Sequence, residues 1–298
     1  MAHHHQHHAA KPVAKRGLVA RHCNRTSLFQ PRARTWLYNH GPSLVAFGHN
    51  EWHSSLACRE LAADIDYVPM VFDLTSLGAL GGIRAYSEIA PHAHWLMGMN
   101  EPSEHNHNQT ARAVAYRWSE MESLASRFAL RLVSPAPGGL ELRKASRWLR
   151  DFFELCKGCR IDAVAVHFYE CDGRDEATAA ASARAMMTFI DDVHRRHKLP
   201  VWLTEWNCGD GAAPQPYANQ SAANHLRFMR HALPLLEAAP HVERYAWFQT
   251  WQRHTPRHPG NNPGCSLTNG DGSALSELGR FYNTFGQPRT MTLKRPVG

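Results

Sequence analysis

Eight short apolar runs alternate along the chain with longer amphipathic segments, and this alternation limits the possible folds more than any other feature. A short apolar run is typical of a buried strand, and apolar residues every three or four positions are typical of a helix. From the fourth run onward the starts recur every 34 to 45 residues, enough for one strand, one helix and two loops. The predicted strands are residues 17–21, 35–39, 67–72, 94–99, 129–134, 163–167, 200–204 and 245–250.

Eight such units in one chain of 298 residues favour an α/β fold, a single (β/α)8 TIM barrel. The predicted helices are residues 109–127, 140–156, 176–197, 219–238 and 273–283. A doubly wound sheet is the alternative. It would usually place a glycine-rich phosphate loop after the first strand, where this chain has His-Cys-Asn-Arg instead. We interpret residues 1–10 as a disordered purification tag and expect residues 11–298 to form a single catalytic domain.

The composition gives weaker indications about partners. The formal net charge of +7 would suit a nucleic-acid-binding protein, but the basic residues are scattered over helix-like segments rather than gathered in a patch. No apolar run approaches the roughly 20 residues of a membrane span. We therefore expect neither a nucleic-acid partner nor a membrane segment, and we expect a monomer.

Two short motifs have ligand types that could bind a metal. Cys156 and Cys159 have zinc-type spacing, but no second pair follows at a ligand-like distance, so a structural pair or disulfide is the better interpretation. The run Glu-His-Asn-His at residues 104–107 has no third and fourth ligand nearby and is interpreted as a solvated loop. We expect no metal and no organic cofactor. The seven cysteines leave at least one thiol unpaired in a monomer.

Two glutamates, Glu101 and Glu205, each follow an apolar run. In a barrel all strands end at one mouth, and a spacing of 104 residues places these two at the fourth and seventh strands. Two carboxylates facing each other suit a glycosidase, as general acid/base and nucleophile. The structural alternatives are a glutamate that begins a helix before Pro102 and a salt-bridged carboxylate at a strand end.

The other strand ends are rich in amides and aromatic side chains, which suit sugar hydroxyls and the apolar faces of sugar rings. Asn100, beside Glu101, is of the type that holds a sugar 2-hydroxyl. His167 and Tyr169 alternate along one strand, so both can face the mouth while Phe168 packs away. The expected substrate-binding residues are Asn39, Asn100, His167, Tyr169, Trp206, Gln249 and Trp251.

An ordered set of motifs resembles glycoside hydrolase family 128 over residues 15–285. The motifs are K-R-G-L-V-A, W-L-Y-N-H, Y-V-P-M-V-F, M-N-E-P-S, L-V-S-P-A, V-H-F-Y, W-L-T-E-W and R-Y-A-W-F. The resemblance implies a (β/α)8 barrel and a retaining β-1,3-glucanase, with Glu101 as general acid/base and Glu205 as nucleophile. It also implies a hydrogen bond from Tyr169 to the nucleophile. The chain departs from the family at His40, where members often have tryptophan.

The expected function is therefore hydrolysis of a β-1,3-glucan, such as laminarin, curdlan or their oligosaccharides, with retention of configuration and internal cleavage. The alternatives are an enzyme that cleaves from a chain end and an oligosaccharide-binding protein on the same barrel. We expect a secreted or extracytoplasmic protein, although no signal peptide is visible.

Overall fold

The computed structural model describes residues 13–19, 28–29, 34–41, 65–80, 93–104, 109–209, 220–250 and 263–286. Its strands are β1 (Val13–Val19), β2 (Arg34–Tyr38), β3 (Asp66–Tyr67), β4 (Trp95–Met97), β5 (Arg131–Val133), β6 (Val164–Phe168), β7 (Val201–Trp206) and β8 (Val242–Trp247). Its helices are α2 (Leu74–Leu80), α4 (Ala111–Tyr116), α5 (Trp118–Arg127), α6 (Leu142–Leu155), α7 (Glu176–His197), α8 (Ala222–Ala238), the 3-10 helix η2 (Pro263–Cys265) and α9 (Glu277–Thr284).

The strands form a closed parallel ring in chain order. Six of them pair in the order β3-β2-β1-β8-β7-β6, and β4 pairs with β5. Two parallel bridges join these sheets: Met70 pairs with Met97 between β3 and β4, and Val133 pairs with Ala163 between β5 and β6. Closure of an eight-stranded parallel ring confirms the (β/α)8 barrel and excludes the open, doubly wound alternative.

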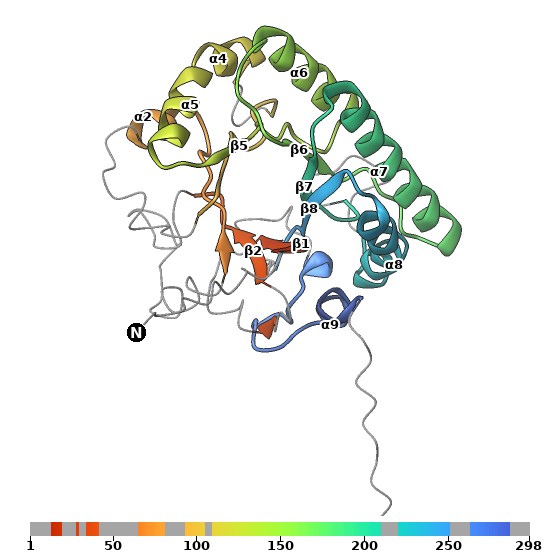
Figure 1. The fold of residues 1–298 in the computed structure, drawn as a ribbon. Coiled ribbons are helices and arrows are strands. Elements are labelled where there is room, and N and C mark those ends of the chain that lie inside the picture. Colours follow the sequence, from red (N-terminus) through yellow and green to blue (C-terminus); the bar gives the residue numbers. More distant parts are fainter. Residues whose placement is uncertain are drawn as a thin grey trace, which may run out of the picture.

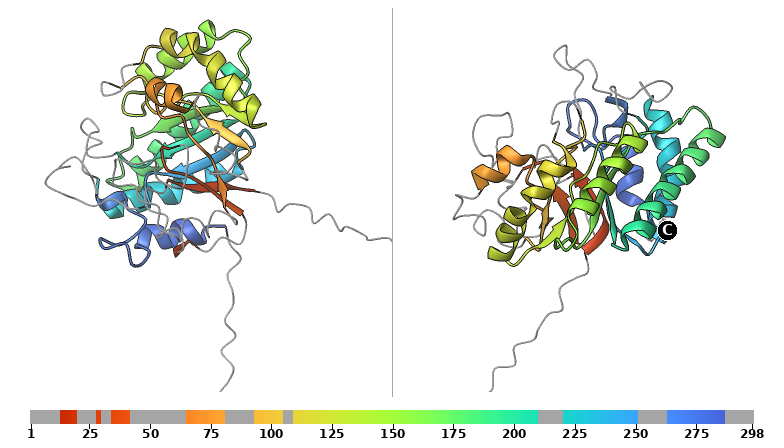
Figure 2. Two further views of the ribbon diagram at one scale, coloured as in Figure 1. Left: turned by 90° about the vertical axis from the view of Figure 1, so that its left-hand side faces the viewer. Right: turned by 90° about the horizontal axis from the view of Figure 1, so that it is seen from above.

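The helices form an outer layer around the strands. Figure 1 shows α4 to α8 in an arc outside the ring, and the turned views in Figure 2 show the same layer from two further sides. Alternate residues of each strand face inward or outward, so the core has two shells. Along β6, Ala165 packs inside the ring with Trp36, whereas Val164 and Val166 pack outward beneath α7 and α8. None of the described helices is long and apolar enough to cross a membrane.

Several predicted boundaries shift for identifiable reasons. The strand β3 is much shorter than the predicted 67–72, since Pro69 lacks the N–H that a ladder needs. The predicted helix 109–127 divides at Arg117, whose ψ of 7° breaks the helical run between α4 and α5. The strand β8 begins and ends three residues earlier than predicted. Cys156 and Cys159 form a disulfide just after α6, as expected.

Candidate active site

Glu205 reaches the inside of the barrel because β7 contains a β-bulge. Val166 of β6 pairs with Leu203, but the next residue, His167, pairs with Glu205. Thr204 is therefore an extra residue in β7, and it reverses the inward–outward alternation after it. Without this bulge, Trp202 inside the barrel would place Glu205 outward. The predicted strand ends at residue 204, whereas β7 continues through Glu205 to Trp206.

Glu205 is 3% exposed, and its carboxylate lies among hydrogen-bond donors. Its Oε1 lies 2.7 Å from Nε2 of His40 and accepts a longer bond of 3.4 Å from the Tyr38 hydroxyl, while the Tyr169 hydroxyl donates to Oε2. Burial alone would raise the pKa of Glu205, but the charge of His167 and the bonds from His40 and Tyr169 lower it to about 2. Glu205 is thus ionised at neutral pH, as a nucleophile must be.

Glu101 stands just beyond β4 in a left-handed backbone conformation, with φ of 42°. Its N–H donates to Ala136 O at 2.8 Å, which fixes the turn against the chain beyond β5. The side chain is 23% exposed, more open than that of Glu205. One oxygen of Glu101, one oxygen of Glu205 and a ring nitrogen of His167 all lie within 4.8 Å of one another.

His167 lies between the two carboxylates. Its Nδ1 is 2.9 Å from Glu101 Oε1 and 3.6 Å from Glu205 Oε2. Burial lowers the pKa of His167, but the charge of Glu205 and the hydrogen bond and charge of Glu101 outweigh it, so that the net pKa is raised. The ring is held by close backbone packing: a Cβ added to Gly139 would come within 2.8 Å of the His167 Cβ. A glycine is therefore required at position 139 for this approach.

The same three residues offer a donor set that could hold a metal ion. Glu101 and His167 are hydrogen-bonded to each other, and the oxygens of Glu205 are bonded to His40 and Tyr169, so each of the three residues already has a protein partner. A tetrahedral site would need a further ligand from the protein or solvent. The expectation that the enzyme needs no metal or cofactor stays a prediction.

Two of the expected substrate-binding amides are buried with an oxygen that has no hydrogen-bond partner among the described residues. These are Asn100, next to Glu101, and Gln249, beyond β8. A buried acceptor without a partner is costly, and a ligand hydroxyl would satisfy it. Both residues therefore remain candidates for sugar contacts. Trp251 lies outside the described residues.

Two other expected substrate-binding residues have different surroundings from those predicted. Trp206 is fully buried on the outer side of β7, edge-on to Trp247 at 4.7 Å and to Phe228, because the bulge that turns Glu205 inward turns its neighbour outward. The prediction that Trp206 stacks on a sugar is therefore wrong. The side-chain oxygen of Asn39 accepts from the Tyr67 hydroxyl and from Gly41 N–H and so holds a turn, and a sugar contact from Asn39 stays a prediction.

His40 belongs to the site but was not among the predicted site residues, although its spacing from Tyr38 could have indicated it. Tyr38 and His40 are two residues apart at the end of β2, so both can face the mouth. His40 was noted only as a departure from the family pattern, without a role. The expected alternation on β6 is confirmed: His167 and Tyr169 contact the glutamates, while Phe168 packs outward against Phe228.

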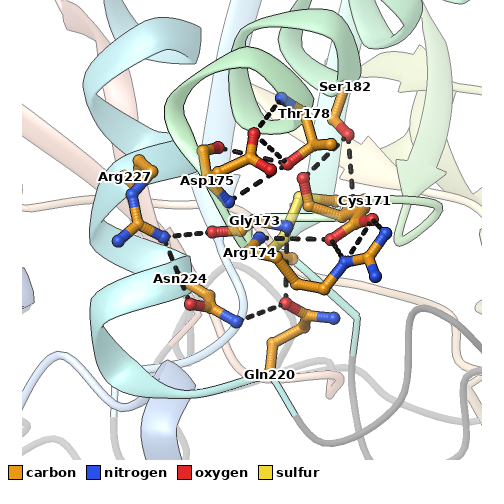
Figure 3. Close-up of polar contacts among 11 residues, drawn as sticks. Cys171, Gly173, Arg174, Asp175, Thr178, Ser182, Gln220, Asn224 and Arg227 are labelled. Carbon is orange, nitrogen blue, oxygen red and sulfur yellow. Dashed lines mark hydrogen bonds and ion pairs between the residues drawn. A yellow bond between two sulfur atoms is a disulfide. The ribbon is translucent and has the colours of Figure 1, made fainter.

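A disulfide between Cys171 and Cys208 ties the loop after β6 to the loop after β7. The neighbouring segment is joined to α8 by further bonds, shown in Figure 3. Gly173 N–H donates to Gln220, and Arg227 donates to the Gly173 carbonyl and to Asn224. The disulfide therefore fixes the chain at Cys171, two residues after Tyr169, and at Cys208, three residues after Glu205.

Comparison with known proteins agrees with this geometry. The family model described as the glycosyl hydrolase catalytic core matches residues 17–282. The chain belongs to this family. It is a glycoside hydrolase, and its solved relatives place it in glycoside hydrolase family 128, as the motifs predict.

Three proteins of known name are similar to this family 128 hydrolase. An endo-β-1,3-glucanase of subgroup II from Sorangium cellulosum is 30% identical, with a TM-score of 0.70, over 91% of this chain and 98% of that one. A curdlan-specific exo-β-1,3-glucanase of subgroup III from Blastomyces gilchristii, in complex with glucose, is 25% identical, with a TM-score of 0.65, over 91% and 97%. The alkali-sensitive linkage protein 1 of Schizosaccharomyces pombe is 26% identical over 227 residues, which are 74% of this chain and 37% of that protein.

Proposed function

We propose that this family 128 hydrolase cleaves β-1,3-glucans with retention of configuration, using Glu205 as nucleophile and Glu101 as general acid/base. The observation that carries the proposal is the short gap between them: an oxygen of each lies within 4.8 Å of the other. Retaining enzymes hold their carboxyl groups about 5–5.5 Å apart, whereas inverting enzymes need about 6.5–9.5 Å to admit a water molecule.

The environments of the two glutamates support distinct roles. Glu205, buried and held by donors on both oxygens, attacks the anomeric carbon and forms a glycosyl ester. Glu101, more open and bonded to His167, gives its proton to the departing glycosidic oxygen. In the second step the Glu101 carboxylate takes a proton from water, whose oxygen attacks the anomeric carbon and releases Glu205. His167, whose Nδ1 lies 2.9 Å from Glu101 and 3.6 Å from Glu205, holds the two carboxyl groups in place through both steps.

The proposed substrate class rests on the relatives. The Sorangium and Blastomyces enzymes are both named β-1,3-glucanases, although the first is an endo enzyme and the second an exo enzyme. We propose internal cleavage, as in the Sorangium enzyme, because the sequence identity to it is higher. Cleavage from the chain end is then the outcome that a product profile must exclude.

The test is hydrolysis of laminari-oligosaccharides of increasing length, with cellohexaose as the linkage control. An endo-β-1,3-glucanase releases a mixture of shorter oligomers from laminarihexaose early in the reaction and leaves cellohexaose intact. Glucose as the sole early product would replace endo by exo action. Glu205→Ala and Glu101→Ala should each abolish release, and full activity in either variant would contradict the assignment of roles.

The disulfides bear on where the enzyme works. Cys156–Cys159 and Cys171–Cys208 are both formed in the described part of the chain, and disulfides persist in oxidising compartments. We therefore propose that the protein is secreted or extracytoplasmic, where β-1,3-glucan polymers would be accessible to it, and that it acts as a monomer.

A further inference from the structure

We propose that His40 is a positioning residue that holds the Glu205 carboxylate in line for attack on the anomeric carbon; this inference rests on the proposed function of Glu205. The contact is direct, with His40 Nε2 2.7 Å from Glu205 Oε1. Because an ionised carboxylate can only accept, the proton of the imidazole ring is on Nε2. A charge-assisted bond of this length is stronger than a neutral one.

The backbone around His40 is shaped for this contact. His40 has φ of 63°, in the left-handed region that non-glycine residues rarely adopt. The Tyr67 hydroxyl contacts the residues on either side of His40, with its oxygen 2.8 Å from Asn39 Oδ1 and 2.7 Å from Gly41 O. Gly41 N–H also donates to Asn39 Oδ1 at 3.1 Å. These hydrogen bonds hold the turn in the conformation that points the His40 side chain at Glu205.

The imidazole ring lies in an aromatic cage. Its neighbours are Tyr38, Phe72 and Phe248, at centroid distances of 5.1, 6.2 and 6.1 Å, and all three meet it edge-to-face. The side chain is 8% exposed. A caged ring has little freedom to rotate, and its apolar surroundings strengthen the bond to Glu205 because water competes poorly there. A merely packed histidine would not need its nitrogen aimed at a carboxylate.

Two donors on opposite oxygens determine the plane of the carboxylate. Tyr169 from β6 bonds Oε2, and His40 from β2 bonds Oε1. If His40 is removed, Oε1 retains only the long contact of 3.4 Å from Tyr38 among the described donors. Within the part of the chain that the structure describes, the other titratable groups that face Glu205 are His167, which lies on the Oε2 side, and Glu101 beyond it. Neither can replace a donor on the Oε1 side.

Two substitutions separate the bond from the shape of the ring. His40→Phe keeps a flat ring in the cage but has no N–H, whereas His40→Gln places an amide N–H near the position of Nε2. The probe is covalent inactivation by a 2-deoxy-2-fluoro-laminaribiosyl fluoride, because fluoride departs without a proton and the rate then reports Glu205 rather than Glu101. Thermal unfolding of each variant checks that the barrel is intact.

We expect His40→Phe to label Glu205 about 10- to 100-fold more slowly than the wild type, the effect of losing one charge-assisted bond to a reacting group. The acid limb of its rate–pH profile should move to higher pH, a shift that a purely structural defect would not produce. His40→Gln should stay within about fivefold of the wild type, since it retains a neutral donor. Labelling of His40→Phe at the wild-type rate overturns the inference, and so does equal slowing in both variants.

The proposed function and this inference fail in different ways. If the wild type is labelled at a residue other than Glu205, the nucleophile assignment is wrong and the role of His40 falls with it. If the wild type is labelled at Glu205 and His40→Phe reacts equally fast with an unchanged pH profile, the nucleophile stands and only the role of His40 is refuted.

Discussion

The Cys171–Cys208 disulfide should stabilise the barrel more than its neighbour does. It closes a loop with a sequence separation of 37 residues, whereas Cys156–Cys159 spans a separation of 3. The chain-entropy treatment of a cross-linked unfolded chain gives about 4 kcal/mol for the longer loop and about 1.5 kcal/mol for the shorter one. For a chain of 298 residues, the larger value corresponds to a fall in Tm of about 6 °C.

Denaturant unfolding of the double variants Cys171→Ala/Cys208→Ala and Cys156→Ala/Cys159→Ala measures both values, with the second pair as the control. Both Cys171 and Cys208 are fully buried, so alanine also removes two packed sulfur atoms. Unfolding the Cys156→Ala/Cys159→Ala variant with and without a strong reductant separates the two effects, because Cys171 and Cys208 keep their sulfurs while, of the two described disulfides, only theirs is opened. Equal losses in the two double variants, or a loss below about 1 kcal/mol for the longer loop, would refute the loop-closure argument.

Two further predictions concern buried charge. Arg244→Met should cost about 3–5 kcal/mol of unfolding free energy, because Asp66, its fully buried partner at 2.7 Å, then has no counter-charge among the described residues. Adding Asp66→Leu should recover most of the loss in denaturant unfolding, and no recovery would refute this account. Burial lowers the pKa of His225 to about 3, so the folded state stays neutral there while the unfolded state binds a proton below about pH 6.5. The contribution of His225 to stability is complete above that pH and falls by about 2 kcal/mol between pH 6.5 and 5. His225→Asn retains an acceptor for Cys208 N–H and should remove that part of the pH dependence of unfolding. An unchanged dependence of stability on pH would contradict the role given to His225.

The barrel could be predicted from sequence because its signal is repeated eight times. Each apolar run and each amphipathic segment supports the same period, so errors of a few residues in β3 or β8 do not alter the architecture. The alternation of His167 and Tyr169 was predictable for a similar reason, since β6 keeps its inward–outward period through the mouth. The spacing of Glu101 and Glu205 follows from the same period.

The failures arise where a contact is decided by one residue of backbone register. The motif W-L-T-E-W does not predict the extra residue at Thr204. That residue nevertheless turns Glu205 into the barrel and Trp206 outward. Similarly, the left-handed turn at His40 depends on Tyr67, 27 residues later, so the local sequence around His40 does not predict it. The Cys171–Cys208 pairing also depends on two loops being adjacent in space, which the spacing of seven cysteines does not specify.

The stereochemistry of hydrolysis tests the central claim most directly. Proton NMR of a laminari-oligosaccharide digest, recorded within minutes of adding enzyme, identifies which anomer of the new reducing end forms first. A gap within 4.8 Å between oxygens of Glu101 and Glu205 predicts the β-anomer first, followed by slow mutarotation to the equilibrium mixture. Initial release of the α-anomer would contradict the double displacement and the roles given to both glutamates.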